Sequence, residues 1–195
     1  MVPHIIVLAA GASTRLGQPK QLAPIGGRPA LHIVIANAVA VAGHNVMVVI
    51  GAHARDITPL LSRTSASWVV NREWEEGMAS SIRAGLAALP PACEAAMILL
   101  GDQVAVTSGD LKRLVDAWKT QESSIAASVY DGRFGVPAIF PYVYFTELAQ
   151  LRGDQGARSV LERNRDTLVR VPMPNAAIDL DTPEQLAELT ARFTT

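Results

Sequence analysis

The sequence predicts a three-layer α/β/α sandwich on a mostly parallel, Rossmann-like sheet, with residues 1–195 forming a single domain. Short apolar runs recur along the 195 residues, and several are continuous rather than alternating, which is typical of strands covered on both faces. Amphipathic segments of helical length separate most of these runs, as in the repeating units of a parallel sheet. The length suits one domain of ordinary size.

The expected strands are the apolar runs at residues 5–9, 46–50, 68–70, 96–100, 125–129, 137–140 and 168–171. The expected helices are the amphipathic segments at residues 28–42, 53–61, 79–89, 108–120, 142–151, 157–164 and 183–193. A small antiparallel excursion is expected between residues 125 and 140. Two helix starts resemble capping boxes, one from Thr107 to Asp110 and one from Thr182 to Gln185.

Composition excludes several classes of protein. Hydrophobic residues make up 49% of the chain and charged residues 18%, which is enough for a full core and excludes disordered and fibrous classes. The 17 basic and 18 acidic residues give a net charge of -1, so no nucleic-acid partner is expected. No apolar stretch is long enough to span a membrane, and residues 1–10 lack the features of a signal peptide. The lone Cys93 excludes a disulfide framework and predicts a cytoplasmic protein.

A glycine-rich loop follows the first expected strand, and the segment from Leu8 to Lys20 reads LAAGASTRLGQPK. Small residues let the backbone approach a ligand and leave its N–H groups free to face phosphates. An arginine grips phosphate with two donors, and a lysine acts as a point charge. We therefore expect Arg15 and Lys20 to be catalytic cations in a triphosphate cradle. The expected nucleotide-binding residues of this loop are Leu8, Ala9, Ala10, Gly11, Ala12 and Ser13.

Two familiar phosphate loops do not match this segment. The P-loop requires a Gly-Lys-Ser/Thr ending, which is absent. The glycines at 11, 17, 26 and 27 do not give the dinucleotide fingerprint G-x-G-x-x-G, and this disfavours a dehydrogenase.

A carboxylate follows the expected strand at residues 96–100, in the tripeptide Gly101-Asp102-Gln103. Ligands of open α/β sheets bind at the carboxyl ends of the strands, so Asp102 should lie beside the cradle. Mg²⁺ takes oxygen ligands and keeps several waters, so one or two carboxylates and phosphate oxygens suffice to hold it. We expect Asp102 to be a catalytic ligand of Mg²⁺; the alternative is a turn or capping aspartate.

The loop sequence resembles the signature L-A-x-G-x-S-x-R-[ML]-G-x-x-K of the nucleotidyltransferases that activate phosphorylated metabolites. Within that family it is most similar to the molybdenum-cofactor cytidylyltransferases, a group of molybdopterin nucleotidyltransferase-like enzymes. The resemblance covers nearly the whole chain because further motifs follow in order. The pair Gly101-Asp102 matches the family's G-D, although Val104 stands where proline is usual.

The resemblance also implies a second metal ligand. The element Asp179-Leu180-Asp181-Thr182-Pro183 is similar to the family's D-[IL]-D-T-P-E, in which the second acid approaches the metal. We expect Asp181 rather than Asp179 to be that ligand. The alternative for either residue is capping of the helix that follows.

The nucleobase is expected to bind at residues 71–86, which resemble the family element N-x-x-x-x-x-G-M-x-x-S-[LI]. Gly77 permits close approach, and Asn71 and Ser81 offer hydrogen bonds to a base edge. The alternative is a loop followed by a helix that Ser80 or Ser81 caps.

The acceptor is expected to bind at two further matches. Gly153 to Arg158 resembles the family's G-D-x-G-A-R, with Asp154, Gly156 and Arg158 as acceptor-binding residues. A helix N-terminus and Arg158 would hold a phosphomonoester. Gly135 and Pro137 stand where these enzymes have the Gly-x-Pro that faces the acceptor. The alternative for both segments is ordinary loop geometry.

Together these features imply a nucleotidyltransferase that transfers a nucleoside monophosphate to a phosphorylated acceptor and releases pyrophosphate. The resemblance favours CTP, because Ala10 replaces the glycine common in guanylyltransferases, and it implies molybdenum cofactor as the acceptor. A molybdoenzyme or its maturation chaperone would receive the product. A guanylyltransferase, a sugar-phosphate nucleotidyltransferase and a non-catalytic carrier of a nucleotide cofactor remain the alternatives. Pyrophosphate release that depends on Mg²⁺ separates an enzyme from a carrier.

Overall fold

The computed structural model describes residues 2–13 and 16–194. Its central sheet consists of β1 (His4–Ala9), β4 (Val46–Ile50), β5 (Ser67–Val70), β6 (Ala95–Leu100), β7 (Ala126–Tyr130), β8 (Arg133–Pro141) and β9 (Val169–Pro172). The α-helices are α1 (Ala30–Ala42), α2 (Ala54–Leu61), α3 (Met78–Ala87), α4 (Ser108–Trp118), α5 (Phe145–Ala149), α6 (Arg158–Arg163) and α7 (Pro183–Thr194). Each predicted strand and helix therefore has a counterpart.

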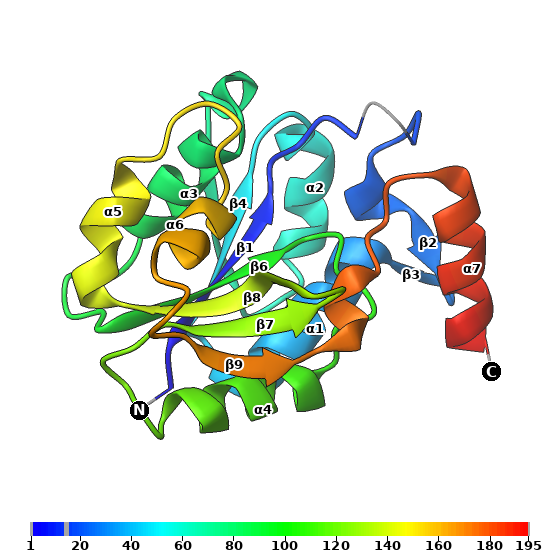
Figure 1. Ribbon diagram of the computed structural model, residues 1–195. Helices are drawn as coiled ribbons and strands as arrows, with labels where there is room; N and C mark the ends of the chain where they lie inside the picture. The colour runs from blue at the N-terminus through cyan, green and yellow to red at the C-terminus, as the bar shows by residue number, and fades with distance from the viewer. Residues whose placement is uncertain (1, 14–15, 195) are drawn as a thin grey trace.

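The seven strands lie in the order β5-β4-β1-β6-β8-β7-β9 (Figure 1). Strand β8 runs antiparallel to β6 and β7, whereas the other neighbouring pairs are parallel. This confirms the predicted three-layer sandwich, its mostly parallel sheet and the antiparallel excursion between residues 125 and 140. The parallel strands β1, β4 and β6 end at the same edge of the sheet, which is where open α/β folds bind ligands.

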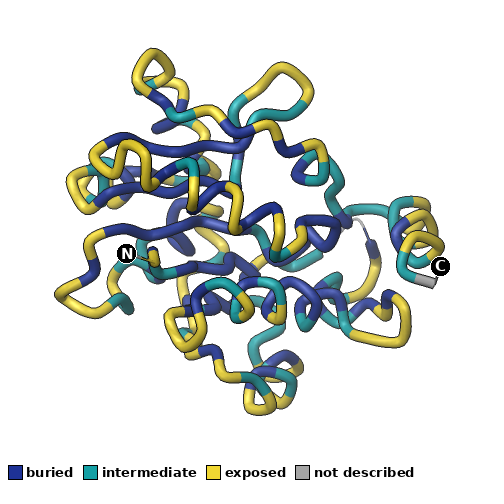
Figure 2. The backbone as a smooth tube through the Cα atoms, turned by 90° about the horizontal axis from the view of Figure 1, so that it is seen from below, coloured by how far each residue is buried: buried dark blue, intermediate teal, exposed yellow. Residues whose placement is uncertain are grey.

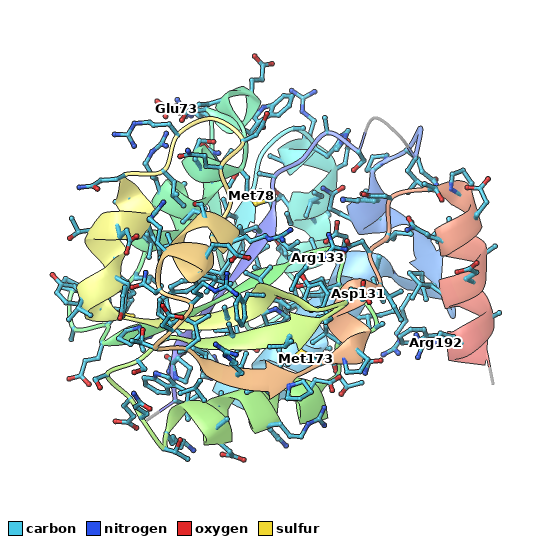
Figure 3. The ribbon with its side chains drawn as sticks, in the orientation of Figure 1. Glu73, Met78, Asp131, Arg133, Met173 and Arg192 are labelled. Carbon is cyan, nitrogen blue, oxygen red and sulfur yellow. The ribbon has the colours of Figure 1, made fainter. Side chains whose placement is uncertain are left out.

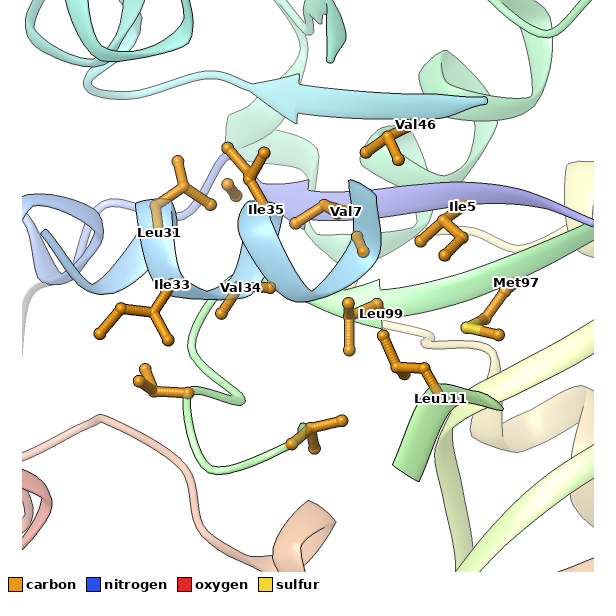
Figure 4. Close-up of a cluster of buried hydrophobic side chains, with 14 of the residues drawn as sticks. Ile5, Val7, Leu31, Ile33, Val34, Ile35, Val46, Met97, Leu99 and Leu111 are labelled. Atoms are coloured by element: carbon orange, nitrogen blue, oxygen red, sulfur yellow. The ribbon is translucent and has the colours of Figure 1, made fainter. Parts of the chain in front are cut away.

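Alternate residues of β1 enter different layers of the core. Ile5, Val7 and Ala9 pack with α1 and α4, whereas Ile6 and Leu8 pack on the face that α3, α5 and α6 cover. Figure 4 shows Val7 beside Ile35 of α1. In Figure 2 the buried segments run through the middle of the molecule, with exposed turns around them. Apolar burial on both faces explains why this strand is a continuous apolar run.

Two predicted helices begin two or more residues later than expected. The segment at 28–42 begins as a helix only at Ala30, because Arg28–Pro29 forms strand β3, which pairs with β2 (Pro24–Ile25). Gly26 and Gly27 both have positive φ and make the tight turn between these strands. The segment at 142–151 starts with a 3₁₀ turn at Tyr142–Tyr144, so α5 is short.

Both predicted capping boxes form. The Thr107 hydroxyl accepts a hydrogen bond from the Asp110 amide at 3.1 Å, and Asp110 Oδ2 accepts one from the Thr107 amide at 2.8 Å. At α7, the side-chain oxygen of Gln185 accepts a hydrogen bond from the Thr182 backbone amide at 3.0 Å, and the Thr182 hydroxyl accepts one from the Gln185 backbone amide at 3.4 Å. Within the described residues, none of the helices is long and apolar enough to cross a membrane.

Asp110 also joins α4 to the segment that leads to α7. Its Oδ2 accepts a hydrogen bond from the side-chain amide of Asn175 at 2.9 Å. Asp110 is only 3% exposed, so water cannot replace this partner readily. Replacing Asp110 with alanine is therefore expected to lower the free energy of unfolding by about 1–3 kcal/mol. Urea denaturation measures this difference. Asp116→Ala, on the exposed face of the same helix, is the control and should change stability little.

The stabilisation by Asp110 should also depend on pH. Burial raises the pKa of its carboxyl, but hydrogen bonds from Asn175, Thr107 and Arg113 outweigh burial and lower the pKa below its usual 3.8. A carboxyl whose pKa is lower in the folded state stabilises the protein above the unfolded pKa and loses that effect as pH falls. The stability difference between the parent protein and Asp110→Ala should therefore shrink below pH 3.8. A difference that stays constant from pH 7 to pH 3 would contradict the assignment.

Candidate active site

A cleft of about 450 Å³ opens where β1 and β6 end. Residues from four loops that lie far apart in the sequence line it. They are Leu8, Ala9, Ala10, Gly11, Ala12, Lys20, Gln21, Trp74, Glu75, Gly77, Met78, Ser81, Leu100, Gly101, Asp102 and Asp154. The structure thus brings the glycine-rich loop, the base segment (residues 71–86), Asp102 and Asp154 of the acceptor segment (residues 153–158) together at one cleft.

The glycine-rich loop is shaped by a residue to which the sequence analysis gave no role. Gln21 is buried, and its amide nitrogen donates to the carbonyls of Ala9 at 3.1 Å and Gly11 at 3.0 Å. Ser13, predicted to contact the nucleotide, has φ 57° and accepts a hydrogen bond from the Lys20 amide at 3.1 Å. Ser13 also donates to Gln21 at 3.2 Å. Gln21 therefore supports the curve of the loop, and no sequence pattern indicated this role. Arg15 lies outside the described residues.

Lys20 stands between the two predicted metal ligands. Its ammonium donates to Asp102 Oδ2 and, at 3.0 Å, to Asp181 Oδ1. Burial alone lowers the pKa of Lys20, but the charges and hydrogen bonds of Asp102 and Asp181 outweigh it and raise the pKa above its usual value. One cation and two carboxylates thus meet at the edge of the cleft: Lys20 and Asp102 line it, whereas Asp181 is not among its described lining residues and joins the cluster through Lys20.

The carboxylates are suited to a hard divalent cation. Asp102 Oδ1 is buried and has no hydrogen-bond partner among the residues that the structure describes, so a lone pair remains available. Within those residues, no group of three or more His, Cys, Asp or Glu side chains gathers to hold a metal. Mg²⁺ needs no such cage, because it commonly takes one or two carboxylates and completes its shell with water and phosphate oxygens. The donor set therefore fits Mg²⁺.

The base segment is held in place from behind the cleft. Asn71 is buried, and its amide donates to the hydroxyls of Ser80 at 2.8 Å and Ser81 at 3.1 Å. Ser81 and Gly77 line the cleft, whereas Asn71 is not among its described lining residues. Trp74, Glu75 and Met78 also line it. None of these three was predicted to contact a ligand, and Trp74 was expected to be a packing residue.

The predicted acceptor residues fall into two groups. Asp154 lines the cleft, and Gly156 lies so close to Met78 that a Cβ at 156 would be 2.8 Å from the Met78 sulfur. Gly135, Pro137 and Arg158 are not among the described residues that line the cleft. Arg158 is exposed, and its guanidinium is 3.8 Å from Glu162.

Gly135 and Pro137 belong to β8, beyond the cleft. A Cβ at Gly135 would be 2.0 Å from the Tyr130 hydroxyl, so only glycine fits there. Burial raises the pKa of Tyr130, and the nearby Asp179 raises it further. Figure 3 labels Asp131, on the turn that follows Tyr130, and Arg133, the first residue of β8.

Gly77 is the point where the base segment approaches residues 153–154 of the acceptor segment most closely, and its φ is +119°. A Cβ at this position would be 2.5 Å from both Asp154 Oδ1 and the Gly153 carbonyl oxygen. Gly77→Ala should therefore displace residues 153–154 and reduce turnover by about ten- to a hundredfold, since misplaced substrate-positioning groups cost rates of this order. Steady-state kinetics measures the effect.

Gly132→Ala is the matched control for Gly77→Ala. Gly132 also has positive φ, but a Cβ there would have no described atom within 4 Å. Both variants should lose some stability from backbone strain, and only Gly77→Ala should lose most of its turnover. Equal turnover in the two variants would contradict the role given to the close packing at Gly77.

Solved structures resemble this fold over nearly its whole length. The Rv0371c homologue from Mycobacterium sp. strain JC1 has a TM-score of 0.84 at 28% identity and covers 97% of this chain and 95% of that chain. Rv0371c from Mycobacterium tuberculosis H37Rv in complex with manganese has a TM-score of 0.79 at 26% identity, covering 96% and 97%. Molybdopterin-guanine dinucleotide biosynthesis protein A from Archaeoglobus fulgidus shares the fold, with a TM-score of 0.74 at 17% identity, covering 96% and 97%.

Curated sequences and a family model also match. The bifunctional protein GlmU of Burkholderia vietnamiensis is 33% identical over 135 residues, which is 68% of this chain and 27% of the relative. The chain therefore spans about a quarter of the length of the curated relatives it matches. The model of the MobA-like NTP transferase domain matches residues 5–168. Since that match includes the glycine-rich loop and Asp102, and covers most of the chain, the protein belongs to the MobA-like nucleotidyltransferase family.

Proposed function

We propose that this protein transfers a cytidylyl group from CTP to the phosphate of molybdenum cofactor and releases pyrophosphate, with residues 1–195 acting as one catalytic domain. The observation that carries the proposal is the meeting of Lys20, Asp102 and Asp181 at the cleft formed by the glycine-rich loop. A lysine between two carboxylates suits a polyphosphate and its divalent cation, because each charge in the cluster has a counterpart in the bound substrate.

The chemistry asks the protein to align and neutralise rather than to form a covalent intermediate. The acceptor phosphate attacks the α-phosphorus of the nucleotide, and pyrophosphate leaves. Lys20 stabilises the negative charge of the triphosphate and of the leaving pyrophosphate. Asp102 and Asp181 would hold Mg²⁺, which neutralises phosphate oxygens when bound. The structure of Rv0371c in complex with manganese, a divalent cation, supports this part of the proposal.

The glycine-rich loop supplies the nucleotide contacts in this proposal. Leu8, Ala9, Ala10, Gly11 and Ala12 line the cleft and present a backbone with little side chain between it and the ligand. Ala10 also carries the preference for CTP, because it occupies the position where guanylyltransferases commonly have glycine. Ser81 and Gly77 would face the base or ribose, and Asn71 would orient Ser81 through its hydrogen bond.

The acceptor would enter from the side of Asp154, where β8 and the start of α6 also lie. Asp154 lines the cleft itself, and Gly156 and Arg158 follow it at the start of α6. Gly135 and Pro137 would border the path on β8. A cytoplasmic location fits an enzyme whose single cysteine, Cys93, is free and buried. The product would pass to a molybdoenzyme or its maturation chaperone.

Pyrophosphate release tests the proposal. Purified protein, Mg²⁺ and purified molybdenum cofactor are incubated with CTP, GTP, ATP or UTP in turn, and pyrophosphate is measured with a coupled assay. Omission of the cofactor and addition of EDTA are the controls. Release with CTP alone, and only in the presence of both cofactor and Mg²⁺, is the expected result.

Other outcomes identify the alternatives. Release with GTP would keep the mechanism and make the protein a guanylyltransferase. Release only when a sugar 1-phosphate replaces molybdenum cofactor would make it a sugar-phosphate nucleotidyltransferase. Nucleotide binding without turnover on any acceptor would contradict catalysis and favour a carrier of a nucleotide cofactor.

A further inference from the structure

Two loops meet beside the cleft, and their contact does not involve Lys20, Asp102 or Asp181. The base loop (residues 74–77) precedes α3, and the acceptor loop (residues 151–156) lies between α5 and α6. The Ala79 amide donates to the Gly153 carbonyl at 3.1 Å, and Gly77 packs directly against Gly153 and Asp154. Figure 1 shows the connection between α5 and α6 rising beside the start of α3, and Figure 3 labels Met78 in this region.

An ion pair closes this contact on its outer side. The guanidinium of Arg83, on α3, donates to both carboxylate oxygens of Glu76 and, at 2.9 Å, to the Leu151 carbonyl. Glu76 in turn accepts a hydrogen bond from the Gly153 amide at 3.2 Å. Glu76 and Arg83 therefore bond to each other and to two backbone groups of the acceptor loop. We call this arrangement the Glu76–Arg83 latch.

The latch contributes little to the core. Ion pairs at the surface typically contribute little to the stability of a fold. Helix α3 is anchored without it by the fully buried Ala79 and Ile82, and the acceptor loop is anchored at its ends by the buried Leu151 and Ala157. A two-pronged arginine–carboxylate bond does, however, restrict geometry strongly. Its consequence should therefore appear in the position of the loop rather than in the stability of the protein.

The loop that the latch holds carries Asp154, which lines the cleft between Gly77 and the acceptor side. A loop that is already ordered spares the acceptor the entropy cost of ordering it on binding. We propose that Glu76 and Arg83 are positioning residues that lock the acceptor loop onto the base loop, so that Asp154 is preset for the phosphorylated acceptor. This inference rests on the proposed function for the identity of the acceptor and on the latch contacts for its geometry.

The first test compares Glu76→Gln with Glu73→Gln. Both changes remove one negative charge next to Arg83, but Glu73 is 3.9 Å from the guanidinium and 78% exposed, whereas Glu76 also accepts the hydrogen bond from the Gly153 amide of the acceptor loop. Glu76→Gln should raise the KM for molybdenum cofactor about tenfold. Its kcat and its KM for CTP should change less than about twofold, and its melting temperature should change by no more than about one degree. Glu73→Gln should leave all four quantities near those of the parent protein.

The second test reads the latch without turnover. Hydrogen–deuterium exchange of the full-length protein reports on the amide of Gly153, which donates to Glu76. Exchange in residues 152–156 should be faster in Glu76→Gln and in Arg83→Lys, since lysine keeps the charge but lacks the planar fork of donors with which arginine holds both oxygens of a carboxylate. The double variant Glu76→Arg with Arg83→Glu keeps an ion pair, but it places a donor against the Gly153 amide and an acceptor against the Leu151 carbonyl, so its exchange should stay fast.

These measurements separate the latch from the proposed function. Unchanged exchange and an unchanged acceptor KM in Glu76→Gln would overturn the latch, even if the parent protein transfers cytidylyl groups. Parallel changes in kcat, both KM values and the melting temperature would also overturn it, because they indicate a general structural defect. Absence of turnover by the parent protein would instead overturn the proposed function, and faster exchange in the variants would still establish the lock between the loops.

Discussion

Lys20→Met is expected to lower kcat by about a hundred- to a thousandfold, the range seen when one preorganised charge donor is removed from a reacting anion. The ammonium is the charge that Asp102 and Asp181 share at the cleft, and methionine keeps the length and apolar stem of the side chain. Steady-state pyrophosphate release measures the loss. Lys119→Met, which removes an exposed lysine from the end of α4, is the control and should retain turnover.

Stability measurements make the result on Lys20 specific. Without Lys20, two carboxylates face one another, so the variant should melt at a lower temperature than the parent protein in EDTA. Added Mg²⁺ should recover part of that loss, because the cation binds the folded state and offsets the same charges. A variant that turns over like the parent protein would show that Lys20 is scaffold rather than site.

Asp102→Asn is the second large effect, with an expected loss of about a thousandfold in kcat, equivalent to roughly 4 kcal/mol of barrier. Asparagine fills the same space but lacks the charge that a divalent cation requires. Binding of Mn²⁺, followed by electron paramagnetic resonance in the presence of CTP, should weaken in parallel. Asp116→Asn, a fully matched substitution on the exposed face of α4, should bind Mn²⁺ and turn over normally.

A normal Mn²⁺ affinity in Asp102→Asn would remove Asp102 from the metal site. If Asp102→Asn fails to fold, Asp102→Glu provides the same test, because it keeps the charge and moves it by one methylene. Reduced turnover with a normal melting temperature in either variant supports the catalytic assignment. An unfolded protein in both cases would mean that the aspartate supports the loop rather than the reaction.

Local patterns were sufficient to predict the fold. The continuous apolar runs marked strands buried on both faces, as the alternation of Ile5 and Ile6 between two core layers shows. The Thr107–Asp110 capping box marked the start of α4 to the residue. The predicted start of α1 was early because two short-range signals conflict. The amphipathic pattern extended back to Arg28, but the Gly26-Gly27 turn and Pro29 place residues 28–29 in a short strand.

The site could be predicted only where a motif carried it. The loop from Leu8 to Lys20 and the pair Gly101-Asp102 were recognisable, and both reach the cleft. Asp181 lies beyond the segment that the family model matches, and only the fold shows that it shares Lys20 with Asp102. No sequence pattern indicates that Gln21 holds two loop carbonyls or that Arg83 reaches Leu151, because hydrogen bonds to backbone carbonyls leave no trace in the residue type of the acceptor.

The central claim is that the α-phosphate of the nucleotide moves to the acceptor while pyrophosphate leaves. The most direct measurement uses CTP labelled with ³²P in either the α- or the γ-phosphate, together with Mg²⁺ and molybdenum cofactor. We predict that label from the α-phosphate appears in the acceptor product, in a one-to-one ratio with pyrophosphate, and that label from the γ-phosphate appears only in pyrophosphate. Transfer of the γ-label to the acceptor, or release of labelled inorganic phosphate without a labelled product, would contradict nucleotidyl transfer at this cleft.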